Sequence, residues 1–286
     1  MIIVAPFTLN PHYPTRGSQK MHLKRFRCFG TDPNSGNEAL VVFQGRTIEW
    51  SVAERQHFAA EQKANACVFI NIVEDGIAPC VLDFYYPHAR SPLCLHASLA
   101  AAHYLHTHQV AEYSGSALTS MRKQILAFSH AGNELHTRVA PEPVTTPVPP
   151  IGAVAKLLGC PESAMKASSA IASIGSPKLL VEMASLEALY ALRPPLNGIV
   201  AWGKASAVNG IYAYAHREMN GYEGRNFNHL DERLEDAATG VAAGALSVLL
   251  ERNIVLHQGL MLGNRCQISA SKGDGLISVG GLVYEA

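Results

Sequence analysis

Two segments of this chain are rich in alanine, leucine and glycine and have no polar face: residues 96–107 and 239–251. A helix that is apolar on all sides has to be buried, so both segments are predicted as central helices. Polar residues come just before each of them, and a helix N-terminus offers free N–H groups and a positive dipole end to an anion. One such N-terminus in each half predicts a pseudo-symmetric protein that binds one acidic molecule between two like domains.

Composition fits this picture and excludes other functions. The 286 residues are 48% hydrophobic and 16% charged, with a net charge of zero, which predicts a sizeable core in one large or two ordinary domains. A neutral chain gives no electrostatic argument for binding nucleic acid or a membrane surface. We found neither a stretch long enough to span a membrane nor a signal peptide, so we expect a cytoplasmic protein.

The six cysteines are scattered, and none forms a CxxC pair. That spacing does not support a zinc ribbon or a thioredoxin-type motif, and we expect free thiols in a reducing compartment. The histidines at 103, 106 and 108 are clustered, but no acidic or thiol partner lies at ligand spacing. We therefore predict no metal site.

A proline-rich stretch at residues 140–150 divides the chain and is predicted as a linker. It separates an N-terminal domain, 21–139, from a C-terminal domain, 151–286, whose last strand is open to pairing with the first domain. Residues 1–20 form an extension without a clear hydrophobic periodicity. We expect helices from Ser51 to about Lys63, and over 151–158 and 185–192; the strands that we expect are 22–28, 40–43, 67–73, 81–86, 168–173, 178–183, 198–202, 210–215, 264–270 and 275–284.

Four motifs, in order and at matching spacing, resemble the PhzF-like family, named for the phenazine-biosynthesis isomerase, in the diaminopimelate-epimerase-like superfamily. They are Gly36–Val42 (GNEALVV), Ala60–Phe69 (AEQKANACVF), Tyr86–Ser98 (YP continuing to CLHAS) and Glu235–Gly240 (EDAATG). The resemblance implies an α/β (α+β) fold of two pseudo-symmetric domains, each a curled mixed sheet around a central helix. It also implies a site in the cleft between them, no metal or organic cofactor, and a homodimer.

The resemblance places the proton-shuttling carboxylate on Glu61, a substrate-holding histidine on His96 and a second carboxylate on Asp236. The family prototype isomerises a cyclohexadiene carboxylic acid by moving a proton around a conjugated ring. One carboxyl can remove and return a proton on a single face if burial brings its pKa near the working pH. Partial burial of Glu61 is expected from its apolar helix neighbours, and a neutral imidazole is expected for His96 at a positive helix end.

Residues at the two helix N-termini are predicted to bind the substrate: Ala97, Ser98, Thr239, Gly240 and Val241. Backbone N–H groups there are suited to a carboxylate. Cys94 fits the first thiol position of the two-cysteine epimerases, but Thr239 stands where the second thiol would be and cannot form a thiolate. A two-cysteine racemase is thus disfavoured, and Cys94 is predicted to be a packing residue.

Departures from the family pattern bear on the substrate. Leu95 replaces the glycine before the histidine, Val241 replaces a serine, Ala66 replaces the second glutamate of its motif, and Arg90 replaces another glutamate. The preferred function is a cofactor-independent isomerase that moves a proton on a small carboxylic acid, with cyclic, dihydroaromatic acids among the candidates. Two alternatives stay open: an amino-acid epimerase or racemase, and a catalytically retired protein of the same fold that binds a metabolite or a partner.

Overall fold

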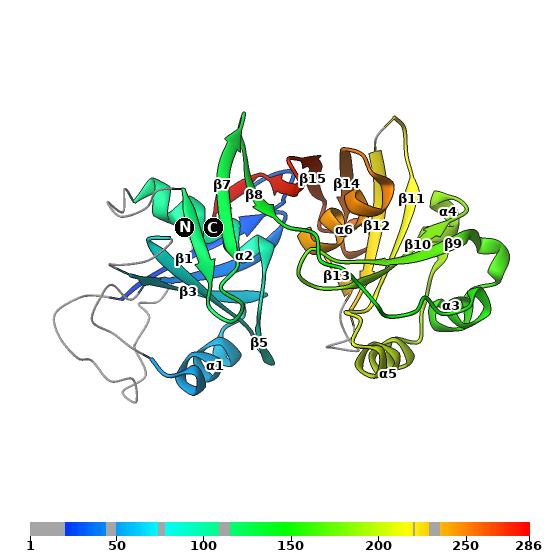
Figure 1. Ribbon diagram of the computed structural model, residues 1–286, viewed down its shortest axis with the longest axis horizontal. Helices are drawn as coiled ribbons and strands as arrows, with labels where there is room; N and C mark the ends of the chain where they lie inside the picture. The colour runs from blue at the N-terminus through cyan, green and yellow to red at the C-terminus, as the bar shows by residue number, and fades with distance from the viewer. Residues whose placement is uncertain (1–20, 44–49, 74–77, 109–114, 220, 229–234) are drawn as a thin grey trace.

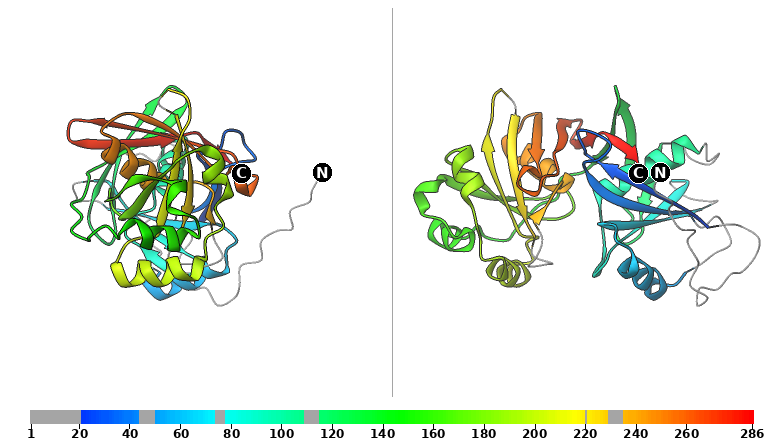
Figure 2. Two further views of the ribbon diagram at one scale, coloured as in Figure 1. Left: turned by 90° about the vertical axis from the view of Figure 1, so that its right-hand side faces the viewer. Right: turned by 180° about the vertical axis from the view of Figure 1, so that it is seen from behind.

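The structure, a computed structural model, describes residues 21–43, 50–73, 78–108, 115–219, 221–228 and 235–286. The chain forms two lobes side by side, one from each half of the sequence (Figure 1). Figure 2 shows the same two lobes from behind and from one end. This is the predicted mixed α/β architecture of two similar halves.

The first lobe alternates strands with two helices. Its elements are β1 (His22–Cys28), β2 (Asn37–Phe43), α1 (Val52–Glu61), β3 (Ala66–Ile72), β4 (Cys80–Tyr86), β5 (Ala89–Ser91), α2 (Leu95–Thr107), β6 (Ser116–Thr119), β7 (Ile125–Ala131) and β8 (Glu134–Val139). Helix α1 begins with the expected capping box, in which Ser51 and Glu54 satisfy each other's backbone N–H groups.

The second lobe repeats this order with more helices on its outside. Its elements are α3 (Ile151–Leu158), η1 (Glu162–Ala164), β9 (Met165–Ala172), β10 (Lys178–Met183), α4 (Leu186–Ala191), α5 (Leu196–Ser206), β11 (Ile211–His216), β12 (Gly221–Phe227), β13 (Glu235–Asp236), α6 (Gly240–Leu250), β14 (Ile254–Gln258), η2 (Leu260–Leu262), β15 (Cys266–Gly273) and β16 (Leu276–Gly281). The last strand, β17 (Val283–Glu285), returns to the first lobe.

Strand pairing shows that the two lobes are built alike. From β1 to β8, neighbouring strands pair antiparallel, parallel, antiparallel, parallel, antiparallel and antiparallel. From β9 to β16 the pairings occur in the same order. In each lobe the Ala-rich helix connects the second parallel pair, so α2 and α6 occupy equivalent positions. Parallel strands need such a crossover, and the helix in it packs on the sheet.

Helices α2 and α6 are central, as predicted. Ten of the thirteen residues of α2 and seven of the eleven residues of α6 are buried. Both helices belong to one apolar core that continues through both lobes. Close packing around α6 depends on Gly244, because a Cβ there would lie 2.1 Å from Cδ1 of Ile174.

The predicted strand at 198–202 is wrong, because these residues belong to α5. Their apolar run resembles a buried strand, but the contacts with the core repeat at helical spacing. Ile199 and Gly203 are buried and Leu196 is partly buried, which is an i, i+3, i+7 stripe. Helix α5 packs on α3 at the outside of the second lobe, where a second apolar core lies.

Two strand pairings join the lobes. Strand β8 of the first half pairs with β16 of the second, and β17, at the end of the chain, pairs with β1. The proline-rich stretch at 140–150 runs between β8 and α3 and is mostly irregular. The extension at 1–20 lies outside the described residues.

Candidate active site at two helix N-termini

The N-termini of α2 and α6 meet between the lobes. In each lobe a short strand, β5 or β13, pairs with the strand before it and leads into the helix, so Cys94 and Thr239 are equivalent N-cap residues. The next residues, Leu95 and Gly240, lie against each other. A Cβ built on Gly240 would be 3.0 Å from Cβ of Leu95 and 3.1 Å from Cζ of Phe29.

Cys94 and His96 form a buried pair at the start of α2. The Cys94 Sγ lies 3.4 Å from Nδ1 of His96, and the two residues are only 2% and 7% exposed. Burial alone would raise the pKa of Cys94, but the charge of His96, the Ala97 backbone N–H and the Tyr86 hydroxyl lower it below its ordinary value. This combination is typical of a reactive thiolate rather than of a packing cysteine.

The pKa of His96 moves in the direction opposite to our expectation. Burial alone would lower it, as the helix dipole would, but the Cys94 thiolate and the Asp236 carboxylate raise it above its ordinary value. The prediction of a neutral imidazole is therefore wrong, and the charged form is favoured. The lowered pKa of Cys94 and the raised pKa of His96 both favour the pair of a thiolate and an imidazolium.

Asp236 lies beside the N-terminus of α6 and is held by neutral donors. The side-chain amide of Asn37 donates to its carboxylate at 2.7 Å, and the Thr239 hydroxyl donates to the other oxygen at 2.6 Å. The Gln258 amide donates to the Asp236 carbonyl and to the Thr239 hydroxyl, and its oxygen accepts from the Thr239 N–H. Asn37 and Gln258, not among the predicted site residues, thus fix this end of the site.

The predicted substrate-binding residues lie at these two helix ends. Ala97 is fully buried in the first turn of α2, and Gly240 and Val241 open α6. The Ser98 hydroxyl is already used, since it donates to the Cys94 carbonyl at 2.8 Å. The backbone N–H groups of both first turns are the donors that remain suited to an anion.

Glu61 is the one predicted catalytic residue that the structure does not bring to this cluster. It is the last residue of α1, which packs on the face of the first sheet opposite to α2, through Phe58 against Phe69. Its side chain is 43% exposed and lies 3.4 Å from Nε2 of His57. The expected burial of Glu61 is therefore wrong.

Ala66, in contrast, belongs to the core around α2 and lies opposite Ala39 in the pairing of β3 with β2. The side chain at position 66 thus faces the candidate site, and the alanine brings no carboxylate there. Arg90, the other departure from a glutamate, donates to the buried carboxylate of Asp83 at 2.8 Å. That ion pair belongs to the side of the sheet on which Tyr85 packs, because Asp83 and Tyr85 alternate with core residues along β4.

Lys178 is a further buried polar residue near Asp236. It is 1% exposed, donates to the Asn226 side-chain oxygen at 2.8 Å, and burial lowers its pKa to about 8. Nothing in the sequence distinguishes this lysine from a surface one, because its burial depends on the alternation of β10 and on the packing of α6.

Neither a metal centre nor a membrane span was identified in the described parts of the chain. Among these residues no group of three or more His, Cys, Asp and Glu side chains is placed to hold a metal ion. Of the clustered histidines, His106 has its ring 5.3 Å from that of His130. No helix of the described part is long and apolar enough to cross a bilayer.

Comparison with solved structures shows the same fold. A phenazine biosynthesis protein of the PhzF family from Bacillus anthracis is 17% identical, with a TM-score of 0.75 over 94% of this chain and 98% of that one. A predicted epimerase from Pseudomonas aeruginosa is 23% identical, with a TM-score of 0.75 over 93% and 97%. A hydroxyproline epimerase from Agrobacterium vitis, 10% identical, has a TM-score of 0.58 over 93% and 90%.

Sequence comparison agrees with the fold. A curated protein of Deinococcus radiodurans, named an uncharacterized isomerase, is 28% identical over 233 residues, which cover 78% of this chain and 74% of that protein. The family model described as "Phenazine biosynthesis-like protein" matches residues 26–280. The predicted family and fold are confirmed, and an enzyme of the isomerase type agrees with these relatives: the chain belongs to the phenazine biosynthesis-like protein family.

Proposed function

We propose that this protein is an isomerase that moves a proton along a small unsaturated carboxylic acid, bound between the N-termini of α2 and α6, without a cofactor. The observation that carries the proposal is the contact of 3.4 Å between Cys94 Sγ and His96 Nδ1, which is buried at the N-terminus of α2 and within electrostatic reach of Asp236. In such a pair the thiolate can act as the general base and the imidazolium as the general acid.

In the reaction that we infer, the Cys94 thiolate takes a proton from a carbon next to a double bond. The double bond shifts, and the His96 imidazolium gives a proton to the far carbon. The thiol proton then returns to His96 across their contact, so both groups recover their starting charge and nothing is oxidised or reduced. We favour Cys94 over Glu61 as the base because Glu61 is exposed on the other face of the sheet.

The position of Cys94 and His96 favours migration of a proton over inversion of a stereocentre. Cys94 and His96 both lie at the N-terminus of α2, in contact with each other, so we expect them to reach one face of a bound molecule. Inversion of a stereocentre needs an acid and a base on opposite faces, and the equivalent residue on α6 is Thr239, whose hydroxyl donates to Asp236. This arrangement supports an isomerase over a two-base epimerase.

The rest of the site is suited to hold the acid. First-turn N–H groups of α2 and α6 offer donors to the substrate carboxylate. The Asp236 carboxylate accepts hydrogen bonds from Asn37 and Thr239, which offset part of its negative charge. It favours the charged form of His96 and repels the substrate carboxylate less than an unbonded carboxylate would. The homodimer implied by the family resemblance stays a prediction, which sedimentation velocity would test.

One observation favours a second candidate, a retired protein that binds a metabolite. Leu95 is 2% exposed and touches the backbone of Gly240, so a large side chain stands where the two helix ends approach each other. A substrate can reach both N-termini only if Leu95 moves. If it does not move, the same fold would serve binding without turnover.

The proposal is tested by deuterium uptake from heavy water into a cyclohexadiene carboxylic acid, followed by mass spectrometry. We expect uptake or isomerisation with the wild type, and about 100-fold to 10,000-fold slower reaction with Cys94→Ala or with His96→Gln. Glu61→Gln is the matched control and should react at the wild-type rate. A loss confined to Glu61→Gln would return the proton shuttle to Glu61, and no reaction with any dihydroaromatic acid would favour the retired protein.

The pH profile supplies an independent readout. The thiolate is present above the pKa of Cys94, which is lowered, and the imidazolium is present below the pKa of His96, which is raised. The rate should therefore rise and then fall with pH, with a broad maximum between the two values. A rate that rises steadily with pH beyond 10 would contradict the role of a charged His96.

A further inference from the structure

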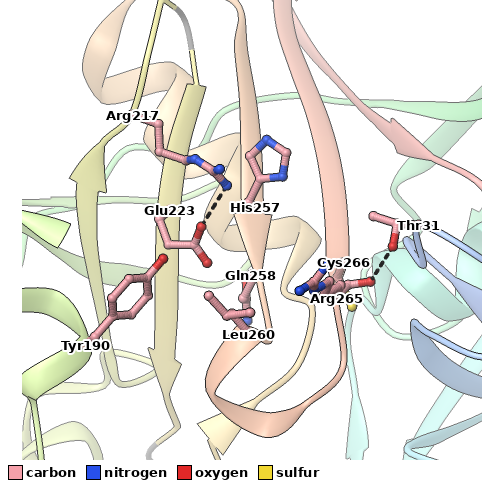
Figure 3. A pocket seen from close by; sticks show the side chains of 9 residues that line it. All are labelled: Thr31, Tyr190, Arg217, Glu223, His257, Gln258, Leu260, Arg265 and Cys266. Carbon is pink, nitrogen blue, oxygen red and sulfur yellow. Dashed lines mark hydrogen bonds and ion pairs between the residues drawn. The ribbon is translucent and has the colours of Figure 1, made fainter. Parts of the chain in front are cut away.

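A pocket lies over β12, β14 and the start of β15, mostly on the face of the second sheet opposite α6. It has a volume of about 450 Å³ and is lined by Thr31, Tyr190, Arg217, Glu223, His257, Gln258, Leu260, Arg265 and Cys266. Figure 3 shows these side chains around the paired strands β12 and β14. Pockets of this size hold small metabolites.

The floor of the pocket carries a buried carboxylate. Glu223 and His257 are register partners on the parallel strands β12 and β14, so their side chains are neighbours on one face. The Glu223 side chain is 3% exposed, and Arg217 donates to it at 3.0 Å (Figure 3). Burial raises the pKa of Glu223, against the lowering effects of Arg217 and the Tyr190 hydroxyl. The Glu223 carboxylate is therefore neutralised by Arg217, and it does not neutralise the other basic side chains of the pocket.

Two basic side chains of the pocket have no such partner. Within the residues that the structure describes, neither the Arg265 guanidinium nor the His257 ring has a hydrogen bond or ion pair with another side chain. Burial and Arg217 lower the pKa of His257, so its ring is neutral and can donate or accept a hydrogen bond. The two arginines that line the pocket outnumber its one lining carboxylate, and Arg217 already pairs with that carboxylate, so Arg265 is the cation left for the carboxylate of a ligand.

The remaining wall indicates an organic acid rather than an inorganic anion. Leu260 lines the pocket and is 42% exposed, in the turn η2 between two glycines with left-handed backbone, Gly259 and Gly263. It offers apolar contact, while the Tyr190 hydroxyl, which is hydrogen-bonded to Glu223, can still accept a hydrogen bond from a ligand (Figure 3). We propose that this pocket is a second binding site, which takes a small organic monoanion with a carboxylate at Arg265 and an apolar body against Leu260.

The pocket adjoins the candidate active site, and Gln258 belongs to both. Glu223 and His257 face outward, whereas their neighbours Tyr222 and Leu256 pack in the core around α6. Gln258 lines the pocket, and its side chain reaches the other way to Thr239 and Asp236. Binding in the pocket is thus measurable without any substrate at the α2 and α6 N-termini.

The experiment is isothermal titration calorimetry of the full chain with 4-hydroxybenzoate, and with inorganic phosphate as a second probe. Arg265→Gln should weaken 4-hydroxybenzoate binding about 10-fold to 100-fold, because it removes a charge-assisted hydrogen bond. Glu223→Gln should tighten it about fivefold, because it removes the competing negative charge. Arg138→Gln, an exposed arginine on β8, is the matched control and should bind as the wild type does.

His96→Gln distinguishes this site from the candidate active site. Binding that survives in His96→Gln but weakens in Arg265→Gln supports the proposal, whatever becomes of the isomerase activity. Affinity unchanged within about twofold in Arg265→Gln, weaker binding in Glu223→Gln, or no heat up to about 10 mM acid would each overturn it. Tighter binding of phosphate than of 4-hydroxybenzoate would overturn the assignment of an organic ligand.

Discussion

The side-chain amide of Asn37 donates a hydrogen bond of 2.7 Å to the carboxylate of Asp236, which is 199 residues further along the chain. The same amide also donates to the Ala238 carbonyl at 2.6 Å. Asn37 is 2% exposed, so one amide from the first lobe closes the loop that leads into α6. A hydrogen-bond donor is needed there, because the acceptor is a carboxylate.

Replacing this donor by an acid should destabilise the protein. Asn37→Asp sets a second carboxylate against Asp236 and removes both hydrogen bonds, so we expect a loss of about 2–4 kcal/mol in the free energy of unfolding at pH 7. The loss should shrink near pH 4, where the two carboxyls can share a proton. Urea denaturation at both pH values measures it, with Asn34→Asp in an exposed turn as the control. An equal loss in the two variants would show that the contact is unimportant.

Among the six cysteines, Cys94 alone should ionise below the ordinary pKa of a thiol. Burial raises the pKa of Cys67, Cys80 and Cys266 to about 12, and raises those of Cys28 and Cys160 as well. Thiolate absorbance at 240 nm in the native protein should therefore show one step below pH 8.5. Cys94→Ser should abolish that step, and Cys160→Ser should keep it. A step that persists in Cys94→Ser would mean that another thiol is the acidic one.

Shortening Leu95 should separate stability from ligand binding. Leu95→Ala removes a buried side chain and should cost about 2–4 kcal/mol, but it frees the space beside Gly240. We expect binding of a cyclohexadiene carboxylic acid to tighten about tenfold, as the acid gains N–H groups of both helices. Leu99→Ala, at a fully buried position in the same helix, should lose similar stability with no gain in affinity. Equal affinities in the two variants would contradict the role given to Leu95.

Lys178 should make the stability of the protein depend on pH above neutrality. Its pKa is about 8 in the folded chain and about 10.4 in an unfolded one, so between these values the unfolded chain binds more protons. The free energy of unfolding should therefore rise with pH from about 8 to 10, by about 1–3 kcal/mol relative to Lys178→Met. Lys204→Met, on the exposed side of α5, should follow the wild type. A constant difference across this range would show that Lys178 keeps its ordinary pKa.

The fold was predictable where one local pattern determined an element. Helices α2 and α6 have no polar face, and α1 has a capping box, so burial and start sites could be read from a few residues. The run at 198–202 is too short to distinguish a buried strand from one face of α5. The hairpin of β7 and β8 went unpredicted, because Ile125–Ala131 is mostly exposed and carries only weak alternation.

The site was predictable only in part, because its decisive contacts join distant segments. His96 and Asp236 lie at the helix ends that the motifs mark. Whether position 61 or position 66 lies on the same side of the first sheet as the candidate site depends on how α1 packs on that sheet, which the sequence does not show. The direction of the His96 pKa depends on a contact of 3.4 Å to Cys94, which spacing along the chain does not predict.

The exchange of strands between the lobes means that neither half of the chain is an independent folding unit. A gene cut at residues 140–150 would yield two polypeptides, each lacking a strand that borders its sheet: β17 would be missing from the first and β8 from the second. Each would expose an unpaired edge and depend on the other to cover it. The two lobes, although similar in fold, thus depend on each other for complete sheets, and the protein resembles a strand-swapped dimer joined into a single chain.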